Sequence, residues 1–193
     1  MQISLPDPEL TELATGFTVR DYKRARDAQQ REGIAEAIRR RFTERYINPA
    51  SDAKYKHGFT MMAISCLMIE ALESFRQGWE SSDGKSKAAF CYFFDSNDEF
   101  MEFRGHAQTF YKNVRCGILH QAETTGGWRI TRKSTAPLFH SSSLTINATR
   151  FLKSLHAVLD KYCDGLKTID WQSSNWRQVL IKMNALCDNC RGE

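Results

Sequence analysis

The chain has 193 residues, of which 41% are hydrophobic and 26% are charged, a composition typical of a globular protein with one substantial core. The 27 lysines and arginines outnumber the 23 acids, so the net charge is +4, which permits a nucleic-acid partner without requiring one. We find no uninterrupted apolar run of membrane-spanning length and no signal-peptide pattern, so we expect a cytoplasmic protein with no membrane partner.

The first part of the chain predicts a short arm followed by a basic helix. Residues 1–18 contain two prolines and little periodicity. From 20 to 46, apolar residues recur at helical spacing, arginines including Arg39 and Arg40 fill the other faces, and Pro49 ends the helix. Two interpretations of this helix stay open, a solvated charged face and a surface that binds RNA phosphates through Arg39 and Arg40.

The segment 56–77 predicts the central helix of the domain, because it is apolar almost all round. Glu70 lies in its middle, and a buried carboxylate needs a partner or a raised pKa. Glu73 is the competitor for any role given to Glu70.

The rest of the chain predicts further short elements in an all-α domain. They are helices over 85–94, 98–103 and 104–122, a small β-hairpin near 128–146, and helices over 148–166 and 174–186. Asn147 is the expected N-cap of the helix that follows it. We therefore predict an all-α fold: a bundle of five to seven helices in one domain over 1–193, with 1–18 as the arm and 167–193 holding the C-terminal helix.

The cysteines do not predict a metal site. Cys187 and Cys190 form the one C-x-x-C in the sequence, and no second such pair or paired histidines accompany it. We expect two free thiols on a frayed terminus, with no metal and no cofactor.

Arg115 and His120 are the residues with the clearest chemical potential. Five residues apart on a helix, they project about 140° apart and flank the core face that Phe110, Val114 and Ile118 are expected to form. An arginine stabilises phosphate charge, and a histidine transfers protons near neutral pH. Spacing alone does not separate a phosphodiester site from two ordinary surface residues.

The stretch from Val114 to His120, late in a helix of an all-α domain, resembles the R-x(4–6)-H motif of the HEPN superfamily, in particular small HEPN-like proteins of bacteria and plasmids. The resemblance covers roughly 20–166. It implies a homodimer in which the motifs of two protomers form one composite site, and a metal-independent endoribonuclease of a toxin–antitoxin or phage-defence system. It also implies that Arg115 and His120 are catalytic, that Glu70 orients Arg115, and that the partners are RNA and an antitoxin or regulatory protein.

One position departs from that pattern. The residue after the arginine is most often polar in the family, where it is expected to help orient the histidine or the RNA. Here that residue is Cys116. A non-catalytic HEPN-like protein that binds nucleic acid or a partner is therefore the alternative. Lys112 and Asn113 are expected either to contact the RNA backbone or to be solvated. A third hypothesis is a plain helical domain that binds nucleic acid through the basic segment 20–45.

Overall fold

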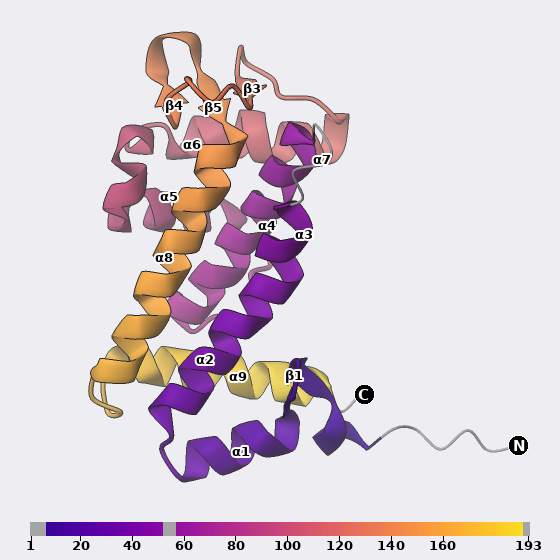
Figure 1. Ribbon diagram of the computed structural model, residues 1–193, viewed down its shortest axis with the longest axis vertical. Helices are drawn as coiled ribbons and strands as arrows, with labels where there is room; N and C mark the ends of the chain where they lie inside the picture. The colour runs from indigo at the N-terminus through magenta and orange to yellow at the C-terminus, as the bar shows by residue number, and fades with distance from the viewer. Residues whose placement is uncertain (1–6, 52–56, 191–193) are drawn as a thin grey trace, which may run out of the picture.

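Long helices build the body of the protein. The computed structural model describes residues 7–51 and 57–190. Helices α2 (Arg31–Phe42) and α8 (Ala148–Thr168) lie side by side with α4 (Gly58–Gln77), while α9 (Ser174–Asn189) crosses one end of the bundle and a small sheet covers the other (Figure 1). The predicted all-α class with a small β element is confirmed.

Shorter elements connect these helices. In chain order they are η1 (Pro8–Leu10), β1 (Glu12–Ala14), β2 (Phe17–Thr18), α1 (Val19–Asp27), η2 (Thr43–Ile47), α3 (Asn48–Ala50), α5 (Ser86–Ser96), η3 (Asp98–Phe103), α6 (Ala107–Phe110), η4 (Tyr111–Arg115), α7 (Cys116–Gln121), β3 (Arg129–Thr131), β4 (Phe139–His140), η5 (Ser141–Ser143) and β5 (Thr145–Asn147).

The single helix predicted over 20–46 is divided in the structure. A capping box between Thr18 and Asp21 starts α1, and a turn with Gln29 in the left-handed region (φ 53°) separates it from α2. No glycine or proline marks this turn, so the sequence pattern did not reveal it. The two helices pack against different partners: the Tyr22 hydroxyl of α1 donates to Asn184 of α9 at 2.9 Å, while α2 packs against α8.

The arm that precedes α1 packs against the domain in its described part. Its strands β1 and β2 pair antiparallel, and Leu13 and Ala14 are buried. Arginines of α2 hold the arm through its backbone, since Arg40 donates to the carbonyl of Thr15 and Arg41 to that of Leu13, both at 2.6 Å.

Helix α4 is the central helix, as predicted. It contacts α5, α8 and α9, and Gly78 ends it in the left-handed conformation (φ 64°). The predicted start at Lys56 lies outside the described residues. In the described part of the chain, α4 is the one helix long and apolar enough to cross a membrane by length and composition. That is a weak indication, because the core helix of a globular protein meets the same criterion and 61% of the most apolar window of α4 is buried.

The small sheet differs from the predicted hairpin. Strand β3 does pair with the segment around 145, but the two run parallel, and β4 is the antiparallel partner of β5. The physical reason is the connection: the chain passes from β3 through a loop to β4 on the far side of β5, so the tight pair is β4–β5.

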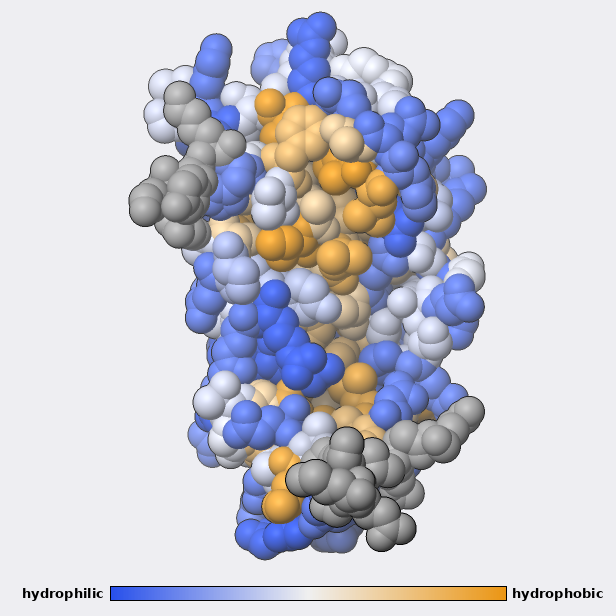
Figure 2. Space-filling model, turned by 90° about the vertical axis from the view of Figure 1, so that its right-hand side faces the viewer, coloured by the Kyte–Doolittle hydropathy of each residue, from blue (hydrophilic) through white to orange (hydrophobic). Residues whose placement is uncertain are grey.

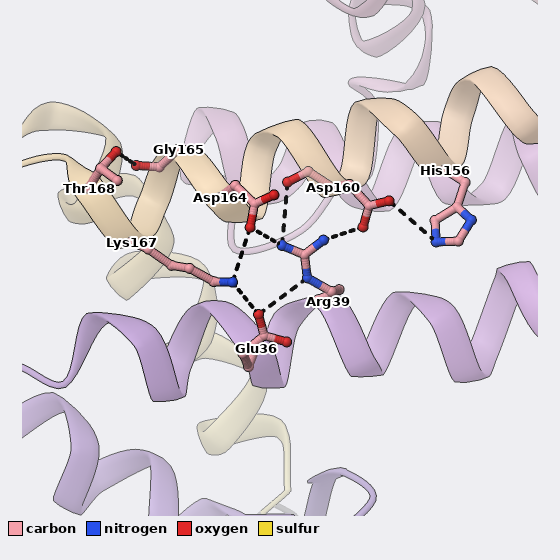
Figure 3. Close-up of polar contacts among 8 residues, drawn as sticks. All are labelled: Glu36, Arg39, His156, Asp160, Asp164, Gly165, Lys167 and Thr168. Carbon is pink, nitrogen blue, oxygen red and sulfur yellow. Dashed lines mark hydrogen bonds and ion pairs between the residues drawn. The ribbon is translucent and has the colours of Figure 1, made fainter.

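A network of charges joins α2 to α8 (Figure 3). The guanidinium of Arg39 contacts Glu36 on its own helix and both Asp160 and Asp164 on α8. Lys167 of α8 completes it by contacting Glu36 and, at 3.0 Å, Asp164. The network spans the contact between two major helices, so it helps to fix their register.

Asn147 should be the polar side chain on which the start of α8 most depends. It is buried, accepts from the backbone N–H of Arg150, and donates to the carbonyls of Lys133 (2.9 Å) and Ala136 (3.0 Å). We expect Asn147→Ala to lower the free energy of unfolding by about 2 kcal/mol, because a cap is lost and two carbonyls lose their donor. Urea denaturation measures this. The control Asn189→Ala, at an exposed position, should change stability by less than about 0.5 kcal/mol, and an equal effect of both substitutions would contradict the assignment.

The network of Figure 3 should make stability sensitive to acid. The hydrogen bond from Lys167 and the charge of Arg39 hold the pKa of Glu36 below its ordinary value of 4.5. Because the folded-state pKa is depressed, the stabilisation is fully present above pH 4.5 and is lost as pH falls through the folded-state value. We expect Lys167→Gln to flatten the acid limb of stability against pH, measured by urea denaturation. An unchanged acid limb would show that the contact contributes nothing.

Candidate functional site

The helix that carries the candidate motif is not a regular α-helix. The predicted helix over 104–122 consists of α6, the π-helical turn η4 and α7. Such single π turns inside α-helices occur frequently at functional sites. Phe110 anchors this helix in the core, with its ring 5.4 Å from that of Phe90 and 5.1 Å from that of Phe94. Phe110 and Val114 are fully buried as predicted, whereas Ile118 is half-buried.

A tight loop after α7 folds back onto the motif helix. Ala122 ends α7 in the left-handed conformation (φ 54°), and the N–H of Thr125 then donates to the carbonyl of Asn113 at 2.9 Å. A Cβ on Gly117 would lie 2.5 Å from the carbonyl oxygen of Glu123, so only glycine allows this approach. The side-chain oxygen of Asn113 also accepts from the Thr125 hydroxyl at 3.0 Å. Asn113 therefore holds the loop, and its contact with RNA stays a prediction.

Arg115 forms a partly buried ion pair with Glu70. Its Nε donates to Oε1 at 2.7 Å and an Nη donates to Oε2 at 3.3 Å. The Ser86 hydroxyl donates to Oε2 as well, at 2.6 Å. The side chains of Arg115 and Glu70 are only 17% and 9% exposed. Burial acts to lower the pKa of Arg115, but the hydrogen bond and charge of Glu70 outweigh it, and the pKa of Arg115 is raised. The contact expected between Glu70 and Arg115 is thus present.

The competing carboxylate, Glu73, belongs to a different group. It pairs with Arg76 at 3.0 Å and accepts from Gln77. Burial raises the pKa of Glu73 despite that pairing. Glu70 is therefore the carboxylate of α4 that meets the motif helix.

Tyr111, Lys112 and Cys116 surround the arginine. The guanidinium of Arg115 lies 5.7 Å from the centre of the Tyr111 ring, a favourable cation–π arrangement. The pKa of Tyr111 is raised, chiefly by the neighbouring Cys116 side chain. Cys116 is half-buried beside these groups, whereas Lys112 is exposed. The side chain of Lys112 is therefore accessible, and its contact with an RNA backbone stays a prediction.

His120 lies at the exposed end of α7, next to Leu119, which is also exposed. Within the described residues, no hydrogen bond or ion pair joins His120 to Arg115 or to Glu70. In one copy of the chain, the imidazole and the guanidinium therefore do not form a contacting pair.

The two arginines proposed as RNA contacts on α2 have other partners. Arg39 is enclosed by three carboxylates (Figure 3), and Arg40 is bonded to the backbone of the arm. Arg39 is paired with acids, and Arg40 is bonded to the N-terminal arm, which the sequence pattern did not place against α2. The charge of Arg39 is therefore compensated by acids, whereas Arg40 is exposed and has a neutral partner, so its contact with RNA stays a prediction.

The C-x-x-C pair is not on a frayed end. Cys187 is buried within α9, where burial raises its thiol pKa to about 11, and the Cys190 thiol donates to the carbonyl of Leu186. Among the described residues, no group of three or more His, Cys, Asp or Glu side chains is placed to hold a metal ion.

Two residues near Arg115, Tyr111 and Ser86, were not among the predicted site residues. Tyr111 precedes Arg115 by four residues, and that helical spacing was a usable signal. Ser86 carried no signal, because it reaches Glu70 only through the turn that joins α4 to α5.

Comparison of the chain with family models, with curated proteins and with solved structures finds no match.

Proposed function

We propose that this protein is a metal-independent endoribonuclease that acts as a homodimer, with one composite site formed by Arg115 and His120 of both protomers. The supporting observation is the arrangement of one half-site. Glu70, which also accepts a hydrogen bond from Ser86, holds the guanidinium of Arg115 in place. His120 is exposed and has no partner in the described residues.

The ion pair with Glu70 holds the Arg115 guanidinium in place and leaves some of its N–H donors free. A guanidinium has five N–H donors, and Glu70 accepts from Nε and one Nη of Arg115. The remaining donors can meet a phosphate without losing the contact with Glu70. A catalytic group held in place by its neighbours needs little reorganisation during the reaction.

Exposed apolar side chains on α4 and α7 supply a surface for the second copy. Leu67 is 44% exposed, Leu119 is 41% exposed and Phe59 is 38% exposed. Leu119 adjoins His120, and Leu67 lies one turn from Glu70 on α4. Figure 2 shows a continuous apolar area on the side of the molecule where α7 lies, bordered by hydrophilic side chains. A second copy seated there would bring two half-sites together around a two-fold axis.

The proposed reaction uses a nucleophile within the RNA. The 2′-hydroxyl oxygen bonds to the adjacent phosphorus as His120 accepts its proton, and the bond from phosphorus to the 5′-oxygen breaks. His120 of the other protomer donates a proton to the leaving 5′-oxygen, and the products are a 2′,3′-cyclic phosphate and a 5′-hydroxyl. The Arg115 side chains stabilise the charge on the pentacoordinate phosphate. RNA cleavage of this kind fits a toxin or phage-defence component controlled by an antitoxin.

Two observations favour a second candidate, a non-catalytic protein that binds RNA or a partner through the same face. Glu70 offsets the charge of Arg115, which weakens its attraction for phosphate. Cys116 stands where the family pattern most often has a polar residue. This candidate keeps the dimer and the binding but shows no cleavage.

Substitution of either Arg115 or His120 should strongly slow cleavage. We expect His120→Ala to slow RNA cleavage by about 10²–10⁴-fold, because a general acid or base is lost. Arg115→Gln should have a similar effect and should relieve any growth inhibition on expression. Gel analysis of labelled RNA with chelator present measures the rate. The matched control is His140→Ala, another exposed histidine, which should cleave like wild type. RNA binding without cleavage by wild type would support the non-catalytic candidate, and equal cleavage by all variants would refute the site.

The apolar face should control the oligomeric state. We expect Leu67→Glu combined with Leu119→Glu to yield a folded monomer that no longer cleaves, because charges are placed in the interface and the half-sites separate. Sedimentation velocity measures the mass, and circular dichroism checks the fold. Met101→Glu, at an exposed apolar position on η3, should stay dimeric. A wild-type protein that is monomeric at all concentrations would rule out the composite site.

A further inference from the structure

A separate groove lies between three helices and holds uncompensated positive charge. It has a volume of about 320 Å³ and is lined by the C-terminal part of α2 with η2, by α4 and by α9. Arg41 of α2 and Lys182 of α9 both face it, although 141 positions separate them in the sequence. Glu70 lies on its wall, so the groove adjoins the Arg115 ion pair without including Arg115.

Arg41 and Lys182 have only neutral partners. Arg41 donates to the carbonyl of Leu13 at 2.6 Å, and Lys182 donates to the carbonyl of Glu80 at 2.8 Å. Arg45, one turn beyond Arg41, is exposed. Among the residues that the structure describes, no carboxylate forms an ion pair with any of these three cations. This sets them apart from the arginines of the bundle that have acidic partners, which include Arg39, Arg76 and Arg115.

The positive charges of the groove disfavour one another. Burial lowers the pKa of Arg41, and the charge of Arg45 lowers it further. Burial likewise lowers the pKa of Lys182, and the charge of Arg41 adds to that effect. Half-buried like charges that disfavour each other are stabilised when an anion lies between them.

The remaining lining limits the kind of anion. Tyr46, Phe75, Leu67 and Leu186 give the groove aromatic and apolar walls. Its volume is at the lower end of the range for small-molecule sites, roughly 300–1,000 Å³, which suits one nucleotide and not a duplex. A ligand with one phosphate and one flat apolar ring system matches both the charges and the walls.

We propose that this groove binds a single nucleotide unit, with its phosphate between Arg41 and Lys182 and its base against Tyr46 and Leu186. The nucleotide comes either from a free mononucleotide or from a single-stranded RNA. The site does not depend on His120 or on RNA cleavage, so it can hold whether or not the proposed ribonuclease activity does.

Calorimetric titration of the full chain tests the proposal. The probes are adenosine 5′-monophosphate, adenosine, inorganic phosphate and a short oligoadenylate. We expect the monophosphate to bind, adenosine to bind far more weakly, and inorganic phosphate to compete. Lys182→Gln and Arg41→Gln should each raise the Kd about tenfold, because each removes a charge-assisted hydrogen bond. The matched control on α9 is Arg177→Gln, at an exposed position, and it should leave the Kd unchanged.

Two further variants separate this site from others. Arg41→Lys keeps the charge and should recover most of the affinity, and urea denaturation of each Arg41 variant shows whether losing the bond to Leu13 unfolds the protein. His120→Ala should bind like wild type. If it weakens binding as Lys182→Gln does, the nucleotide lies at the proposed catalytic site and the groove is refuted.

The set of probes that bind also identifies the source of the nucleotide. Binding of oligoadenylate alone, with the same sensitivity to Arg41→Gln and Lys182→Gln, supports a strand as the ligand. In each variant, the slope of log Kd against log salt concentration should then be smaller than in wild type by about one unit. The proposal is overturned if no probe binds, if adenosine binds as well as its monophosphate, or if the two variants behave like Arg177→Gln.

Discussion

Burial of most of α4 is the constraint on which the other elements depend. A helix with apolar residues around most of its circumference must be covered by neighbours, and α5, α8 and α9 cover it. The same burial makes Glu70 costly unless it is paired, since a carboxylate out of water needs donors. Arg115 and Ser86 supply those donors. The ion pair with Glu70 thus helps to fix the position of the motif helix, which Phe110 and Val114 also anchor in the core.

The pairing of charges divides the cations of this basic protein into two groups. Arg39 and Arg76 are bonded to carboxylates and stabilise contacts within the bundle, as the network of Figure 3 shows for α2 and α8. Arg41 and Lys182 are bonded only to carbonyls and keep their charge uncompensated. Net charge did not distinguish these groups. The second group attracts a phosphate more strongly, because a guanidinium that is paired with a carboxylate already has a counter-ion.

The two proposals rest on neighbouring parts of one face that share Leu67 and Glu70. Glu70 contacts Arg115 on one side and lines the nucleotide groove on the other. The apolar residues Leu67 and Leu119 border these polar groups. If both proposals hold, a strand bound in the groove would lead toward the composite site, and Glu70 would be the residue common to binding and positioning.

The sequence by itself determined the helical class, the central helix and the N-cap at Asn147, because these follow from local periodicity and capping chemistry. The cost of burying a charge required a partner for Glu70, but Arg115 as that partner came from the family resemblance. The sequence did not determine the turn at Gln29 or the parallel pairing of β3, because no local signal marks either. Nor could it show that Arg39 is enclosed by acids from α8 or that Arg41 and Lys182 share a groove. Those outcomes depend on which distant helices pack together, and only the tertiary structure decides that.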